Sequence, residues 1–232
     1  MITDRQNLIL EKIVRDYIYS AQPVSSEYLE KKYNFGVCPA TIRNEMQKLT
    51  DNGYLFQPYT SAGRIPTDKG YRYFVDNLKI DELEIGGWFK NDLADMMKFT
   101  HSLTKKIAEF SQSLVWTYLG KENLSWKEGW EGLLQEPEFG EKNIIANFTN
   151  LLENFEKQIT KDSHPQISET EVTVYIGKEN PYSKEKDFSI ITSRCRLPDE
   201  EEVILTLFGP KRMAYDKNIA LINSLTKFFE DF

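Results

Sequence analysis

One stretch of the sequence gathers side chains of the types that read nucleic acids. Within residues 39–52, Ile42, Met46 and Leu49 recur at positions i, i+4 and i+7, so the spacing predicts a helix that buries them on one face. The other face carries small, amide and cationic side chains, which are Ala40, Thr41, Arg43, Asn44, Gln47 and Lys48. This set suits the base edges of the major groove and the flanking phosphates. A solvated helix face in a small bundle would show a similar pattern, so both interpretations stay open.

Two further helices are predicted to precede and position this one. Residues 3–20 favour a helix because Thr3 and Gln6 fit a capping box, in which each residue satisfies a backbone amide of the other. Ser25 is suited to cap a short second helix, which ends at the Asn34-Phe35-Gly36 turn. Two short helices around a tight turn, after a longer helix, are typical of a helix-turn-helix.

The residues that follow predict a hairpin and a fourth helix. Residues 54–57 favour a short strand, residues 64–66 can return antiparallel to it, and residues 58–63 form a turn-rich tip. Such a hairpin beside a helix-turn-helix is a wing. Its hydroxyls, backbone amides and Arg suit phosphate or minor-groove contacts, and two more cations lie near the start of the helix that Thr67 caps. The predicted contacts of this region are Thr60, Ser61, Gly63, Arg64, Lys69 and Arg72.

Two of these segments resemble a known protein family. Residues 39–46, Pro-Ala-Thr-Ile-Arg-Asn-Glu-Met, and residues 60–67, Thr-Ser-Ala-Gly-Arg-Ile-Pro-Thr, resemble the winged-helix head of the HrcA family, the heat-inducible transcription repressors of bacteria. The resemblance implies a protein that binds an inverted DNA repeat upstream of chaperone operons as a dimer and represses them. It also implies a chaperonin as a partner.

The charge distribution predicts two domains. The chain has a net charge of −7, yet residues 1–78 hold ten Lys and Arg against nine Asp and Glu. We therefore expect a winged helix-turn-helix head at residues 1–78, a linker at residues 79–87 that ends in Gly86-Gly87, and an acidic body at residues 88–232. A near-neutral head is compatible with DNA binding when its cations gather on one face.

A long helix is predicted to begin near Trp88. Its apolar residues follow an alternating spacing of four and three, which is a seam of period 3.5. The positions proposed for dimerisation on this seam are Leu93, Met96, Leu103, Ile107, Phe110 and Leu114. The seam is either a contact between subunits or the face by which the helix packs on its own domain, and the spacing fits both.

The rest of the body predicts an α+β fold. Residues 120–140 have a loop-like composition, residues 142–159 favour an amphipathic helix, and a helix that buries Leu221, Ile222, Leu225, Phe228 and Phe229 ends the chain. Strands are expected at residues 171–176, 188–197 and 203–208, the last two joined by a turn at residues 198–201.

The resemblance extends into the body. Residues 133–139, 176–181 and 209–215 resemble stretches of the family's GAF-like domain. Typical members are longer, and the family's early GAF-like strands and inserted dimerising subdomain have no counterpart here. We therefore expect a reduced GAF-like domain with about three strands. Arg212 is either an anion ligand or a cation that stabilises a turn, and we favour the second role.

Composition argues against several other classes of protein. Two Cys without a CxxC pair and two His leave little material for a metal site, and we find no catalytic motif, so we expect neither an enzyme nor a cofactor. No apolar run is long enough to cross a membrane, and the N-terminus lacks a signal-peptide core, so we expect a cytoplasmic protein. The alternatives to a repressor are a protein-interaction module that keeps only the winged-helix shape and a ligand-sensing regulator.

Overall fold

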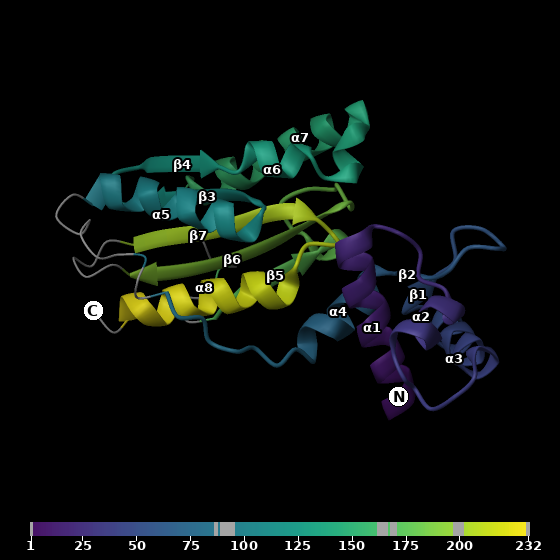
Figure 1. Ribbon diagram of the computed structural model, residues 1–232. Coiled ribbons are helices and arrows are strands. Elements are labelled where there is room, and N and C mark those ends of the chain that lie inside the picture. Colours follow the sequence, from purple (N-terminus) through teal and green to yellow (C-terminus); the bar gives the residue numbers. More distant parts are fainter. Residues whose placement is uncertain are drawn as a thin grey trace. The chain divides into compact units, whose positions relative to one another are not determined.

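A computed structural model describes residues 2–85, 88, 96–161, 167, 171–196 and 202–230. The chain divides into two compact units, which we call the head, residues 1–78, and the body, residues 79–232. In Figure 1 the head is coloured purple to blue and the body runs on to yellow. The predicted linker residues Gly86 and Gly87 lie outside the described residues.

The head contains four helices and a two-stranded antiparallel ribbon. They are α1 (Asp4–Ser20), α2 (Ser26–Lys32), α3 (Pro39–Asp51), β1 (Leu55–Phe56), β2 (Ile65–Pro66) and α4 (Asp68–Asp76). The predicted capping box is confirmed, because the Thr3 amide donates to Gln6 Oε1 over 3.0 Å and the Gln6 amide donates to Thr3 Oγ1 over 3.3 Å. Ser25 and Thr67 cap α2 and α4 in the same manner, each accepting from a backbone amide three residues later.

The core of the head confirms the helix periodicities. Ile42 and Leu49 of α3 are fully buried and Met46 is 3% exposed, which leaves the opposite face of α3 outward. They pack with apolar side chains of the other helices, including Ile9, Leu10, Ile13, Val14, Leu29, Tyr71 and Phe74. Each such buried side chain stabilises the fold by about 1.5–3 kcal/mol. The core therefore fixes which face of α3 is exposed.

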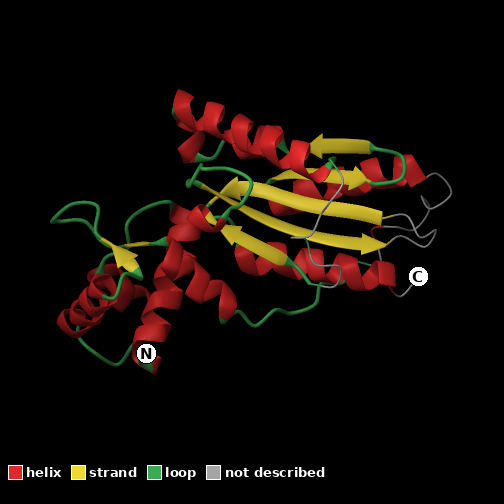
Figure 2. Ribbon diagram, turned by 180° about the vertical axis from the view of Figure 1, so that it is seen from behind, coloured by secondary structure: helices red, strands yellow, loops and turns green. Residues whose placement is uncertain are grey.

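The body is a five-stranded antiparallel sheet with helices on both faces. Its elements are α5 (Met96–Ser111), β3 (Leu114–Leu119), β4 (Leu124–Glu128), α6 (Trp130–Leu134), the 3-10 helix η2 (Pro137–Gly140), α7 (Lys142–Ile159), β5 (Thr173–Ile176), the 3-10 helix η3 (Gly177–Glu179), β6 (Phe188–Arg196), β7 (Glu202–Pro210) and α8 (Tyr215–Glu230). The strand order is β4-β3-β7-β6-β5. Figures 1 and 2 show this sheet from opposite sides, with α5 and α8 in front of it in Figure 1.

Side chains alternate between the two faces of the sheet, so each face of the body has its own core. On one face, aromatic side chains of β3, β6 and β7 pack against α7, and Phe155 lies with its ring centroid 5.0 Å from that of Phe208 and 5.5 Å from that of Trp116. On the other face, buried hydroxyls meet α5 and α8; Thr104 of α5 donates to Thr117 of β3 over 2.8 Å. Both faces of the central strands are thus covered, which is why β3 and β7 read as nearly continuous apolar runs.

The predicted long helix is shorter than its apolar spacing indicates. α5 ends at Ser111, Gln112 adopts a left-handed φ of 54°, and residues 114–119 form the strand β3. Leu114 fits the helical spacing only by coincidence, because it lies in a strand, where residues three apart point to opposite faces. Leu114 indeed packs with the α7 core, whereas Thr117 meets α5.

The sheet is also larger than expected, with five strands in place of about three. Residues 120–140, predicted to be loop-like, contain β4, α6 and η2. The prediction failed because β4 is a short edge strand whose side chains are mostly exposed, so no run of buried apolar residues marks it in the sequence. The helix at residues 142–159 and the three later strands are confirmed, while residues 198–201 of the predicted turn lie outside the described part of the chain.

The residues of the proposed dimer seam are largely internal. Leu103, Ile107 and Leu114 are at most 1% exposed within the single chain, as the intramolecular alternative requires, so they do not offer an open surface to a second subunit. Phe110 is half-buried and its ring lies edge-on to that of Trp88, with centroids 5.7 Å apart. Leu93 and the side chain of Met96 lie outside the described residues.

Candidate functional site

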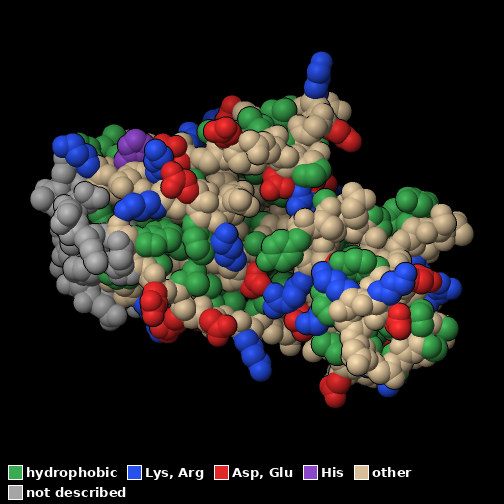
Figure 3. Space-filling view, viewed as in Figure 1, with side chains coloured by type: hydrophobic (Ala, Val, Ile, Leu, Met, Phe, Trp, Pro, Cys, Tyr) green, Lys and Arg blue, Asp and Glu red, His purple; other side chains and the backbone are tan. Residues whose placement is uncertain are grey.

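The outward face of α3 carries the side chains that the sequence indicates for base contacts. Ala40, Arg43, Asn44, Gln47 and Lys48 are exposed and Thr41 is half-buried. They share one face because Ile42, Met46 and Leu49 occupy the other. The cations of this face are limited to Arg43 and Lys48, and acidic and basic side chains are interspersed on the face of the head that Figure 3 shows. Any attraction for an anion must therefore come from local clusters.

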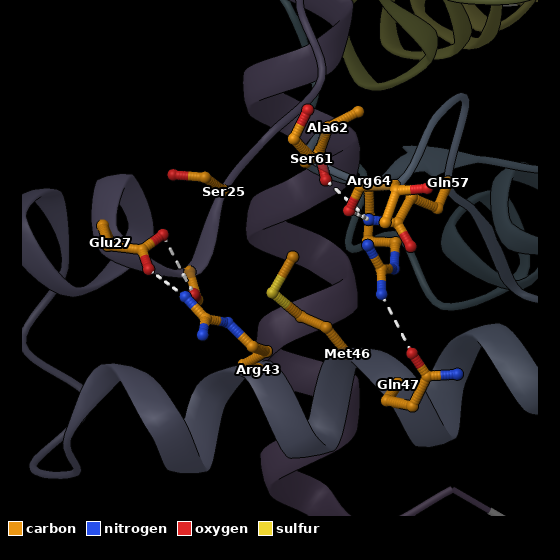
Figure 4. Close-up of a pocket in the computed structure, with 12 residues that line it drawn as sticks. Ser25, Glu27, Arg43, Met46, Gln47, Gln57, Ser61, Ala62 and Arg64 are labelled. Carbon is orange, nitrogen blue, oxygen red and sulfur yellow. Dashed lines mark hydrogen bonds and ion pairs between the residues drawn. The ribbon is translucent and has the colours of Figure 1, made fainter.

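A groove of about 360 Å³ lies between α2, α3 and the β1–β2 loop, residues 57–64 (Figure 4). Its lining is mostly polar and comprises Ser25, Ser26, Glu27, Arg43, Met46, Gln47, Gln57, Thr60, Ser61, Ala62, Gly63 and Arg64. Segments far apart in the sequence thus meet here. The structure brings the predicted residues Arg43, Gln47 and Thr60–Ser61 to one concave surface.

Arg43 is held at the edge of this groove by an acidic partner. Its guanidinium forms an ion pair with Glu27 of α2, and 64% of the Arg43 side chain and 51% of the Glu27 side chain are exposed (Figure 4). Hydrogen bonds from the Glu27 backbone amide and from the Ser26 hydroxyl, together with the Arg43 charge, lower the pKa of Glu27. An exposed ion pair of this kind is weak. Glu27 can therefore orient Arg43 in the free protein without preventing it from turning to another partner.

Other polar residues of α3 are also held by neighbours. Lys48 lies 3.0 Å from a carboxylate oxygen of Glu45, whose other oxygen accepts from Gln6 Nε2 over 2.8 Å. These hydrogen bonds, with that from Lys48 the larger influence, lower the pKa of Glu45. Gln47 Nε2 donates to Asp51 over 2.8 Å. The outward face of α3 is thus arranged before any ligand binds.

In the β1–β2 loop, the predicted contact residues Arg64, Thr60 and Ser61 lie in different surroundings. Arg64 is only 7% exposed and points inward to α3, whereas Thr60 and Ser61 are exposed at the tip. Burial and the Arg43 charge lower the pKa of Arg64. Sequence reasoning also missed Gln57, whose side-chain amide donates to the carbonyls of Thr60 and Ala62 over 2.9 and 3.0 Å and shapes the loop from within.

Gly63 has a packing role in the same loop. A Cβ at this position would lie 2.4 Å from the carbonyl carbon and oxygen of Val24. Only glycine permits the close pairing of the loop with the segment before α2. This close packing accounts for the glycine without any DNA contact.

Lys69 and Arg72 of α4 do not line the groove. Lys69 Nζ donates to the Asn52 carbonyl over 2.8 Å and lies 4.3 Å from the centre of the Tyr54 ring. Arg72 Nη1 lies 3.3 Å from Asp76 one turn along the helix. A contact of either cation with DNA would need these local interactions to be shared or exchanged.

Arg212 of the body occupies a structural position. Its Nε and Nη2 donate to the two carboxylate oxygens of Glu138 over 2.6 and 3.0 Å, and it also pairs with Glu136. The two family-like stretches at residues 133–139 and 209–215 are therefore joined by one ion cluster, in which Arg212 is buried and both carboxylates are partly exposed. These contacts favour the stabilising role over an anion site, because the guanidinium already faces two carboxylates.

Within the described residues, no group of three or more His, Cys, Asp or Glu could hold a metal ion. Over the same part of the chain, no helix combines the length and the apolar character that crossing a bilayer requires.

Comparison with known proteins identifies the family. The family model for the HrcA protein C-terminal domain matches residues 76–219. A heat-inducible transcription repressor HrcA from Alkaliphilus metalliredigens is 62% identical over 77 residues, which are 33% of this chain and 22% of the relative. The protein of the same name from Thermodesulfovibrio yellowstonii is 29% identical over an alignment of 336 residues that spans 98% of this chain and 97% of the relative.

That alignment is longer than the 232 residues of the chain, so the relative has residues without a counterpart here. A crystal structure of a hypothetical protein shares the fold along the whole chain, with a TM-score of 0.83, 22% sequence identity and coverage of 100% of this chain and 98% of the other. The family model covers more than half of the chain. The chain therefore belongs to the HrcA family of heat-inducible transcription repressors.

Proposed function

We propose that this chain is a DNA-binding repressor of heat-shock genes, including chaperone genes, that recognises an inverted-repeat operator. The observation that carries the proposal is the outward face of α3, where Arg43, Asn44 and Gln47 stand beside an open groove. Amide and guanidinium groups are the side chains that read adenine and guanine edges in the major groove. The relatives' name, heat-inducible transcription repressor, agrees with this chemistry.

The head is best understood as a winged helix-turn-helix. In this proposal α2 and α3 are its two helices, α3 enters the major groove, and the ribbon β1–β2 with its loop is the wing. The exposed hydroxyls of Thr60 and Ser61 then face the DNA backbone. The groove between α3 and the wing would receive the edge of one strand.

The body is proposed to be a GAF-like domain that regulates the head and supports a dimer. A single head reads only a few base pairs, and a symmetric dimer doubles the site. Because Leu103, Ile107 and Leu114 are internal, the dimer must use other surface of the body. We further propose a chaperonin as a partner, a cytoplasmic location and no enzymatic activity, which are the expectations that the resemblance to the HrcA family supports.

The main alternative is an interaction module that keeps the winged-helix shape without binding DNA. Salt dependence separates the two functions, because binding to DNA releases condensed counterions. For the wild-type chain on a labelled inverted-repeat duplex, we expect the affinity to fall steeply between 50 and 200 mM salt. Fluorescence anisotropy measures this directly, and an affinity that does not change with salt would contradict the proposal.

A single variant makes the same experiment residue-specific. Lys48 is 58% exposed on the outward face of α3, and its amine lies 3.0 Å from Glu45. Lys48→Ala should reduce the slope of log affinity against log salt by about 0.9, the value for one phosphate contact. The matched control is Lys157→Ala, which removes a similarly exposed lysine of α7 in the body, with 63% of its side chain exposed, and should leave the slope unchanged.

A further inference from the structure

Arg64 connects the wing to α3 through two directed hydrogen bonds. Its Nε donates to Thr50 Oγ1 and its Nη2 donates to Gln47 Oε1, each over 3.0 Å. Both acceptors belong to α3, and Figure 4 shows the Arg64 side chain reaching across the groove to Gln47. With 7% of the residue exposed, the guanidinium is committed to the interior of the head. Burial of a charged group costs free energy, and the hydrogen bonds from Arg64 to α3 offset that cost.

The acceptors are themselves arranged by further hydrogen bonds. The Thr50 hydroxyl donates its only proton to the Met46 carbonyl over 2.9 Å, so its oxygen is left to accept from Arg64. Gln47 donates through Nε2 to Asp51 and accepts through Oε1 from Arg64. The Gln47 amide is thus bonded at both ends and has one orientation. A residue of the predicted reading face is therefore aimed by a side chain from the wing.

The backbone of Arg64 makes a third connection. Its amide donates to the Val24 carbonyl over 2.8 Å, and its carbonyl accepts from the Val24 amide over 2.9 Å. Val24 immediately precedes the segment that begins α2. One residue thus sets the spacing between the wing, α2 and α3, which are the three walls of the groove.

We propose that Arg64 is a positioning residue for operator recognition, which holds Gln47 and the wing in the geometry that reads the specific site and does not itself neutralise a phosphate. This inference rests on the proposed DNA-binding function. It differs from the prediction made from the sequence, where Arg64 was expected to contact DNA. It also explains why arginine is used, because only a planar guanidinium presents two donors in a fixed fork to two separate acceptors.

Three variants separate positioning from phosphate contact. Arg64→Lys keeps the charge but loses the fork, and it should weaken binding to the inverted repeat roughly 10-fold while changing affinity for random DNA less than about 2-fold. Arg64→Met removes the charge and should leave the salt slope of the wild type unchanged. Thr50→Val removes one acceptor without touching any cation, and we expect a loss of specific affinity in the same direction, roughly 3-fold.

The measurement is anisotropy on both DNAs over a range of salt, with thermal melting of each variant to show that the head is folded. If Arg64→Lys does not fold, Thr50→Val carries the test. The inference is overturned if Arg64→Lys and Thr50→Val bind the inverted repeat as the wild type does, or if Arg64→Met lowers the slope by about 0.9. If the wild type itself shows no preference for the inverted repeat, the proposed function fails first, and the inference fails with it.

Discussion

Arg43→Ala and Asn44→Ala are each expected to weaken binding to the specific operator by about 1–3 kcal/mol, which is roughly a 5- to 150-fold loss of affinity. Both side chains are exposed on the face of α3 opposite the core. A side chain that bonds to a base edge contributes to the correct sequence and little to any other. Affinity for random DNA should therefore change much less. Titration of each variant on operator and random duplexes gives both values.

A matched control distinguishes the effect of losing a positive charge from the effect of losing a base contact. Arg5→Ala removes the same charge from an exposed position of α1 that does not line the groove. It should reduce binding slightly and equally on both DNAs. Equal losses on operator and random DNA for Arg43→Ala would instead show that Arg43 acts through its charge alone and is not a base reader.

Phe155→Ala is expected to destabilise the body by about 3–5 kcal/mol. Phe155 is fully buried, and its ring lies 4.6 Å from that of Tyr182 and 5.0 Å from that of Phe208, between centroids. Truncation would leave a cavity among rings that cannot easily collapse. Urea unfolding followed by tryptophan fluorescence reports on the body alone, because all four Trp lie between residues 88 and 130.

Ile145→Ala is the control for this prediction. Ile145 lies on the same helix, α7, but is 41% exposed, so its truncation should change the free energy of unfolding by only about 0.5 kcal/mol. If the two variants unfold at the same urea concentration, the packing of α7 on the sheet is not as described. Head signals in far-UV circular dichroism should persist in both variants.

The head could be predicted closely from its sequence because its signals are local. Caps at Thr3, Ser25 and Thr67 and the spacing of Ile42, Met46 and Leu49 each act within a few residues, and the structure confirms them. The body could not be predicted as well. The run at residues 114–119 is buried on both faces, so it has no periodicity of its own to distinguish it from a helix.

The candidate site also has one part that local sequence signals predict and one part that they do not. The outward face of α3 follows from helical spacing alone, whereas the role of Arg64 depends on Gln47 and Thr50, which lie 17 and 14 residues away. The pairing of Glu27 with Arg43 spans 16 residues and has no local signal either. The sequence held one hint of the inward position of Arg64. The glycine directly before it indicates a close approach of two backbone segments, and this approach places Arg64 at the base of the loop.

In the function proposed here, a dimer of this chain reads an inverted repeat with α3. Hydroxyl-radical footprinting of the full chain, on DNA from upstream of the chaperone genes of its own genome, tests this claim most directly. We expect two protected patches related by the repeat's symmetry, with centres one helical turn of about 34 Å, or a multiple of it, apart. Protection spread evenly along the DNA, without regard to the repeat, would contradict the account.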